Sequence, residues 1–249
     1  MMEILDGVSP WLFVVAPLVI IVAYTVFGLS GFGSTVISVP ILAHFLPVSF
    51  LVPLMVLLDM TSATIIGTAG REQVAVGELK RIIPFMFAGF VVGTFALVKV
   101  PDDYLRPALA VFTIVIGANS ILNPRIRKRI SPWWCVPTGV VGGSVATVFG
   151  AGGPIYATYL SGRLQDKTEI RSTMSALISI SAITRAILYA IAGLLLHLAV
   201  LAGGLALAPF VFIGLKIGHR IHVGLTQEQM RRVVGAIVVV TGTLLLFKG

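Results

Sequence analysis

Two ionisable residues lie inside long apolar stretches of the chain. Asp59 falls about midway along 48–69, and Arg185 falls about midway along 172–196. A charged side chain at the centre of a membrane helix costs about 2.5–3.5 kcal/mol on insertion scales, so it usually has a function. The planar guanidinium of arginine suits a sulfonate, a carboxylate or sulfite. We expect Arg185 to bind an anionic substrate and Asp59 to carry a coupled proton or to pair with Arg185. A purely structural ion pair is the alternative.

Two glycine-rich stretches interrupt apolar segments elsewhere in the chain. The first reads Gly28-Leu-Ser-Gly-Phe-Gly-Ser34, and the second reads Gly150-Ala-Gly-Gly-Pro154. Glycine clusters break helices, and a helix that restarts presents unpaired backbone N–H groups and the positive end of its dipole, which suit an anion. The residues that we expect to bind substrate are Ser30, Gly31, Gly33, Ser34, Thr35, Gly150, Gly152, Gly153 and Arg185.

Each residue at these breaks also has a purely structural alternative. Serine and threonine hydroxyls in helices often donate to carbonyls of their own helix. That alternative applies to the first break and to Ser144 and Thr147, which precede the second break. The glycines could likewise serve only to let two helices approach closely.

The composition is that of an integral membrane protein. Of 249 residues, 57% are hydrophobic and 11% are charged, whereas ordinary soluble domains carry about 25% charged residues. The net charge of +8 comes from short basic clusters between apolar runs, which orient a membrane protein, so no nucleic-acid partner is expected. The single cysteine, Cys135, excludes an intramolecular disulfide and a cysteine metal cluster. We expect no metal, no cofactor and no catalytic residue, and therefore no enzyme.

The hydrophobic pattern predicts an all-α polytopic fold with eight to ten membrane segments. A basic cytoplasmic linker, 123–131, joins two halves, because basic loops stay inside. With that loop inside, both termini fall outside and every other basic loop falls inside. Each half is expected to hold a glycine-broken hairpin and three spanning helices: 11–46, 48–69, 82–98 and 105–122 in the first half, and 132–160, 172–196, 198–218 and 230–247 in the second.

The two halves, 1–122 and 132–249, share an internal repeat. An offset of 123 residues aligns Arg185 with Ser62, three residues after Asp59. Corresponding loops fall on opposite sides of the membrane, so the repeats are expected to be inverted, as in secondary transporters with a site near the midplane. An offset of 125 pairs Pro84, Phe85, Gly89 and Gly93 with Pro209, Phe210, Gly214 and Gly218, and an offset of 119 pairs Gly31 and Gly33 with Gly150 and Gly152.

These features resemble the TauE/SafE family of sulfite and organosulfonate exporters. The resemblance rests on the first glycine motif followed by Val39-Pro40, on the stretch from Gly142-Gly143 to Pro154, and on the closing pattern from Met230 to Ala236. It implies a bacterial inner-membrane transporter that exports a small sulfur-containing anion, such as sulfite or sulfoacetate. We expect alternating access at a midplane site between the two breaks. The expected partners are the small anion and the lipid bilayer, with a homodimer as an option.

Other functions stay open on the sequence alone. They include a permease for another small anion or solute, an anion channel and a non-transporting membrane assembly factor. A remote alternative is a rhomboid-like intramembrane protease, because Gly28-Leu-Ser-Gly31 fits the GxSG pattern around that nucleophile. The second break has no serine at the corresponding position, so duplication explains the glycines better than a nucleophile does.

Overall fold

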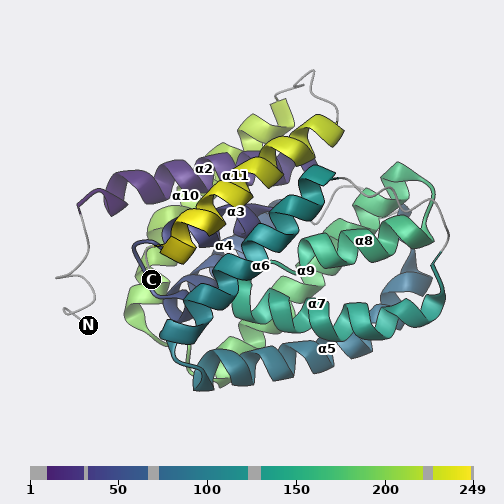
Figure 1. The fold of residues 1–249 in the computed structure, drawn as a ribbon, viewed down its shortest axis with the longest axis horizontal. Coiled ribbons are helices and arrows are strands. Elements are labelled where there is room, and N and C mark those ends of the chain that lie inside the picture. The colour runs from purple at the N-terminus through teal and green to yellow at the C-terminus, as the bar shows by residue number, and fades with distance from the viewer. Residues whose placement is uncertain (1–9, 31–32, 67–72, 123–129, 221–226, 248–249) are drawn as a thin grey trace.

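The computed structural model describes residues 10–30, 33–66, 73–122, 130–220 and 227–247. These residues form ten α-helices and one short 3-10 helix, without a strand in the described ranges (Figure 1). In chain order the helices are α2 (Leu12–Ser30), α3 (Ser34–Leu42), α4 (Val48–Ile66), α5 (Val76–Lys99), α6 (Asp102–Leu122), η2 (Pro132–Trp134), α7 (Cys135–Phe149), α8 (Gly153–Arg163), α9 (Lys167–Ile191), α10 (Leu198–Arg220) and α11 (Gln227–Phe247). The predicted all-α class is confirmed.

Five of the described helices are long and apolar enough to cross a membrane. Large apolar side chains such as Phe87, Phe95 and Phe212 point outward, which suits a lipid environment and not water. The chain is therefore a polytopic membrane protein. The five spans are Leu12–Leu29, Val76–Lys99, Asp102–Leu122, Thr168–Ile191 and Leu198–Gly218, and shorter apolar helices cover Val48–Ser62 and Arg232–Phe247.

Helix α9 lies earlier in the chain than its hydrophobic stretch suggests. It covers Lys167–Ile191 instead of 172–196. The Asp166 side chain accepts hydrogen bonds from the backbone N–H groups of Thr168 and Glu169 and so caps the helix start. The hydropathy pattern does not predict this helix start, because the first turn of α9 is polar. The start is instead indicated by Asp166, whose side-chain oxygen caps the helix.

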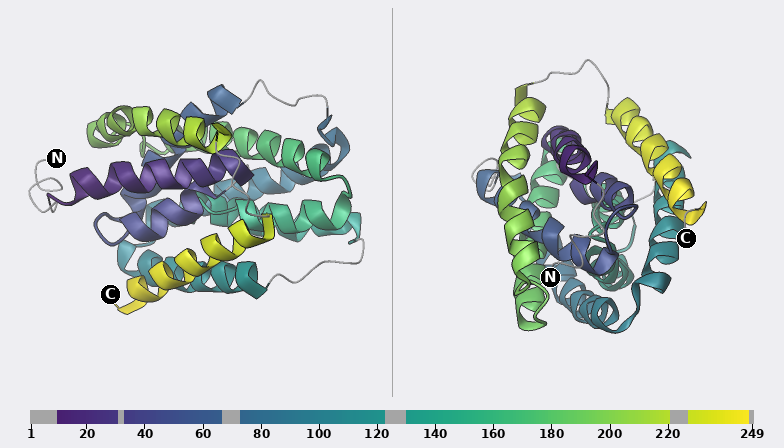
Figure 2. Two further views of the ribbon diagram at one scale, coloured as in Figure 1. Left: turned by 90° about the horizontal axis from the view of Figure 1, so that it is seen from above. Right: turned by 90° about the vertical axis from the view of Figure 1, so that its left-hand side faces the viewer.

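The helices pack in pairs around a central helix, α4. Its residues Leu51, Met55 and Leu58 are completely buried. The principal pairs are α5 with α7, α10 with α2, and α6 with α11. In the right-hand view of Figure 2, α10 lies on one side of the molecule and α6 with α11 on the other. Glycines allow the first two pairs to approach closely, since a Cβ at Gly89 would overlap the Val140 carbonyl and a Cβ at Gly214 would lie 2.6 Å from the Ile21 carbonyl.

The ends of the molecule differ in their charged residues. The start of α2 and the end of α11 lie at the same end (Figure 1). At the other end, the start of α5 is tied to the end of α8, because Glu78 Oε1 accepts from Arg163 Nη2 and from Arg81 Nη1, both at 2.8 Å. The Tyr159 hydroxyl also donates to Glu78 Oε2, at 2.5 Å.

Candidate substrate site

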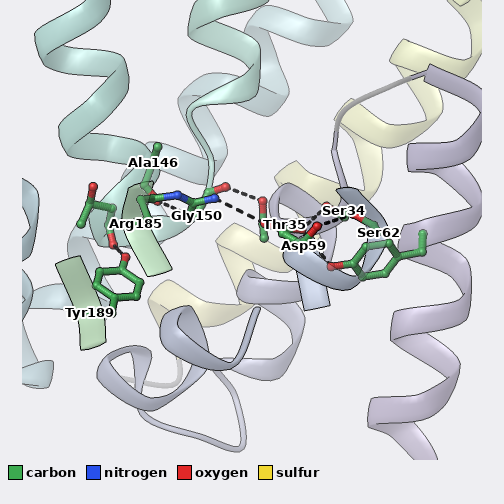
Figure 3. A network of polar contacts seen from close by, with 10 residues as sticks. Ser34, Thr35, Asp59, Ser62, Ala146, Gly150, Arg185 and Tyr189 are labelled. Carbon is green, nitrogen blue, oxygen red and sulfur yellow. Dashed lines mark hydrogen bonds and ion pairs between the residues drawn. The ribbon is translucent and has the colours of Figure 1, made fainter. Parts of the chain in front are cut away.

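The two glycine breaks lie against each other inside the helix bundle. Gly33, immediately before α3, has a φ of 106°, and Gly150, immediately after α7, has a φ of 72°. Both backbone conformations are left-handed, which glycine adopts without a steric penalty. The Thr35 hydroxyl donates to the Gly150 carbonyl and so joins the start of α3 to the end of α7 (Figure 3).

Asp59 and Arg185, both buried, meet beside this junction. Arg185 Nη1 donates to the Ala146 carbonyl at 2.8 Å, and Nη2 lies 3.4 Å from Asp59 Oδ2. Asp59 Oδ1 accepts hydrogen bonds from the Tyr24 hydroxyl at 2.8 Å and from Ser34 Oγ at 3.1 Å. The carboxylate therefore has donors from α2, α3 and α9, and Arg185 extends between Asp59 and the end of α7 (Figure 3).

A small cavity of about 30 Å³ lies between the breaks. It has room for about two water molecules, so a larger ligand needs the surrounding helices to move apart. Asp59 and Arg185 are the charged residues among those described around it. The lining residues are Phe27, Gly33, Ser34, Thr35, Val36, Asp59, Ala146, Gly150, Gly152, Gly153, Tyr156, Ile178, Ser181 and Arg185. In the described ranges, no three His, Cys, Asp or Glu side chains gather as a metal site.

Two helix N-termini contribute to this cavity. Neither Gly33, before α3, nor Gly152, before α8, provides a side-chain cap for the helix that follows. The first N–H groups of a helix have no acceptor within the helix, and they carry the positive end of its dipole. Together with the guanidinium of Arg185, they make the cavity suitable for an anion.

The structure gathers most of the residues expected at the site. Eight of them line the cavity: Gly33, Ser34, Thr35, Asp59, Gly150, Gly152, Gly153 and Arg185. Ser30 ends α2, and its side chain lies outside what the structure describes, as does Gly31. Ser144 and Thr147 follow the structural alternative, because Ser144 Oγ donates to the Gly89 and Val140 carbonyls and Thr147 Oγ1 donates to the Gly143 carbonyl.

Three polar residues at the site were missed from the sequence. Ser181 lies one helical turn before Arg185 and lines the same cavity, so the i, i+4 spacing was an available signal. Tyr24 and Tyr156 lie within apolar runs, where a tyrosine is usually a packing residue. Their roles depend on neighbours from distant helices, which the sequence does not show.

Comparison with known proteins agrees with the glycine motifs. Residues 16–245 match the family described as sulfite exporter TauE/SafE. The chain belongs to the TauE/SafE family. It is also similar to a protein named probable inner membrane transporter protein TsaS, from Comamonas testosteroni, with 24% identity over 192 residues that cover 76% of this chain and 80% of the relative. No solved structure matches the chain significantly. Membership of TauE/SafE confirms the predicted resemblance and makes the chain a membrane transporter and not an enzyme.

Proposed function

We propose that this protein exports a small sulfur-containing oxyanion, sulfite or an organosulfonate, across the inner membrane by alternating access. The anion binds in the cavity between the two glycine breaks. The observation that carries the proposal is that two helix N-termini without side-chain caps and a buried arginine, Arg185, meet at one small cavity. The TauE/SafE family and the relative named as an inner membrane transporter support both the substrate class and the membrane.

The contacts of Arg185 suggest how the anion binds. Its Nη2 contact with Asp59 is 3.4 Å long, whereas its Nη1 contact with the Ala146 carbonyl is 2.8 Å. The longer contact is the weaker one, so an incoming oxyanion replaces Asp59 at Nη2 while Nη1 keeps the arginine in place. Asp59 stays hydrogen-bonded to Tyr24 and Ser34, where it is positioned to carry a coupled proton.

Matching contacts in the two halves support inverted repeats as the basis of alternation. Thr25 Oγ1 in α2 donates to the Gly214 carbonyl of α10 at 3.2 Å. Ser144 Oγ in α7 donates to the Gly89 carbonyl of α5 at 3.1 Å. Ser144 follows Thr25 by 119 residues and Gly214 follows Gly89 by 125, which are two of the three offsets of the sequence repeat. Each hairpin thus packs on a long helix of the opposite repeat through an equivalent hydrogen bond.

In our proposal, the packing of each hairpin on a helix of the opposite repeat determines which parts move together. The repeats 1–122 and 132–249, joined by the linker 123–131, are taken as two similar halves related by an axis in the membrane plane. Because α2 packs on α10 and α7 packs on α5, each hairpin moves with a long helix of the opposite half, and rocking of these two units opens the cavity to each side in turn. The basic loops face the cytoplasm and both termini face outside. Outward movement of one negative charge then releases about 2.3 kcal/mol per 100 mV of membrane potential.

The test is sulfite transport by purified protein in proteoliposomes. We expect Arg185→Gln to lower saturable sulfite flux at least about tenfold, because the charge-assisted contacts to the oxyanion are lost. A double variant, Asp59→Asn with Arg185→Gln, leaves no unpaired buried charge and is expected to fold while remaining inactive. Arg81→Gln removes a half-exposed arginine at Glu78 and serves as the control.

Two results contradict the proposal. One is wild-type sulfite flux in both Arg185 variants, and the other is flux that does not saturate and exceeds carrier rates. The second result indicates a channel. A third pattern points to a permease that depends on the carboxylate. In that pattern Arg185→Gln keeps its sulfite flux, whereas Asp59→Asn alone loses it.

A further inference from the structure

Two hydrogen-bond donors at the cavity lack a protein acceptor in the described ranges. They are the hydroxyl of Tyr156 and the Nε–H of Arg185, both buried. A buried polar group without a partner destabilises the folded state, and native structures hold few of them. Both residues line the cavity between the glycine breaks. A ligand with acceptor oxygens in that cavity is the simplest reason for the chain to keep both donors unpaired.

The glycines of the second break make room for the Tyr156 ring. A Cβ at Gly142 would overlap the ring at Cε1, and a Cβ at Gly152 would lie 2.9 Å from Cε2. Side chains on a helix lean toward its N-terminus, so the ring of Tyr156, the fourth residue of α8, covers the start of that helix. Pro154 in the first turn has no N–H, and the Tyr156 hydroxyl supplies a donor near this helix start.

The two breaks differ in their acidic partners. At the first break, the Asp59 carboxylate of this chain accepts hydrogen bonds from Tyr24 and Ser34. The repeat offset of 123 residues aligns Asp59 with Ala182, so the second break has no carboxylate of its own at that position. Tyr156 aligns with Ile37 at the offset of 119, so the first break has no tyrosine at the position that corresponds to Tyr156.

We propose that Tyr156 is a substrate-binding residue whose hydroxyl, together with Arg185 Nε, donates to two oxygens of the oxyanion at the start of α8. This inference rests on the proposed function. It adds the position of the bound oxyanion and a second side chain, Tyr156, that donates a hydrogen bond to it. The substrate occupies, at the second break, the place that the Asp59 carboxylate occupies at the first. An oxyanion with two acceptor oxygens on one centre, such as sulfite or a sulfonate, can accept from both donors at once. Chloride is a single atom and does not present two acceptor oxygens to this pair of donors.

The test compares Tyr156→Phe with wild type in detergent, under anaerobic conditions, by titration with sulfite and by thermal unfolding. Loss of a hydrogen bond to a charged ligand should weaken sulfite binding about tenfold or more. Without ligand, the variant should melt at the same temperature as wild type or higher, because phenylalanine removes a buried unpaired hydroxyl. Tyr159→Phe is the control in the same helix. Its hydroxyl donates to Glu78, so the melting temperature should fall while sulfite affinity stays unchanged.

The outcomes separate this inference from the proposed function. If Tyr156→Phe binds sulfite as wild type does while Arg185→Gln does not, the role of Tyr156 is wrong and the proposed function stands. If Tyr156→Phe lowers the melting temperature of the empty protein as Tyr159→Phe does, its hydroxyl is structural and the inference is overturned. If wild-type protein binds neither sulfite nor sulfoacetate, both proposals fail together.

Discussion

At the scale of single residues, the Asp59–Arg185 pair dominates the energetics of the site. Both side chains are buried, and removing one partner of a buried ion pair costs about 3–5 kcal/mol, since the other charge is left without compensation. The pair is unequal. Asp59 also accepts from Tyr24 and Ser34, whereas within the described ranges the hydrogen bonds of Arg185 go to Asp59 and to the Ala146 carbonyl. The Arg185 side chain therefore has more need of a bound anion as a partner than the Asp59 side chain has of a bound cation.

We predict that Asp59→Asn increases sulfite affinity by about tenfold or more. The substitution removes a negative charge beside the anion site and frees Arg185 Nη2. The empty protein should melt at a lower temperature, and sulfite should raise that temperature by more than it does for wild type. The measurement is thermal unfolding across a sulfite titration. Ser62→Ala, whose hydroxyl donates to the Asp59 backbone carbonyl, is the matched control in α4, and weaker sulfite binding in Asp59→Asn would contradict the prediction.

At the scale of helices, close approach between α5 and α7 and between α10 and α2 holds the two hairpins in place. Both contacts run through glycine faces, Gly89 with Gly93 and Gly214 with Gly218. In a bilayer, where burying apolar surface between helices gains little, packing of small residues is a main source of helix association. The position of each glycine break therefore depends on a helix from the opposite half of the chain.

We predict that Gly89→Ala and Gly214→Ala each destabilise the protein by about 1–3 kcal/mol, the usual cost of overpacking. The added methyl group meets backbone carbonyl oxygens, which cannot rotate away as a side chain does. The control is Gly77→Ala in the first turn of α5, where a Cβ would meet nothing within 4 Å and a gain of about 0.5–1 kcal/mol is expected. Thermal unfolding in detergent measures all three, and equal melting temperatures would refute this account of the contact.

At the scale of the whole molecule, the two ends carry different charged residues, and the proposed substrate site lies between them. Glu78, Arg81 and Arg163 cluster where α5 starts and α8 ends. Asp102 begins α6 near the opposite end of α5. There its carboxylate accepts from Ser49 Oγ at 2.6 Å and ties α6 to α4. Basic residues favour the cytoplasmic side, so the arginine-rich end is expected to face inward.

We predict that labelling of single cysteines in intact cells reports this orientation. Cys135 is buried, and Cys135→Ser gives a cysteine-free background. In that background, Asp103→Cys at the exposed start of α6 should react with a membrane-impermeant maleimide from outside. Gln165→Cys, exposed between α8 and α9, should react only after the membrane is permeabilised. The reverse pattern would place the arginine-rich end outside and would contradict this orientation.

The sequence predicted those features that depend on residue type and local order. The apolar runs predicted an all-helical membrane protein, the glycine motifs predicted the TauE/SafE family, and Asp59 and Arg185 stood out because charge is rare inside such runs. Helix boundaries that are set by polar caps were harder to predict from the sequence, as the early start of α9 at Lys167 shows. The role that we propose for Tyr156 could not be predicted from the sequence, since a tyrosine among apolar residues is ordinary until its hydroxyl is found without a partner in the described ranges.

What the sequence determined by itself is the membrane environment, the family and the presence of two helix breaks, because bilayer insertion and helix breaking follow from local composition. Only the tertiary structure decided which groups meet at those breaks. It placed Arg185 between Asp59 and the Ala146 carbonyl, joined Thr35 to Gly150 and left the Tyr156 hydroxyl and Arg185 Nε facing no acceptor in the described chain. Residues more than one hundred positions apart become neighbours only through helix packing, and hydrogen-bond pairing is a property of that packing.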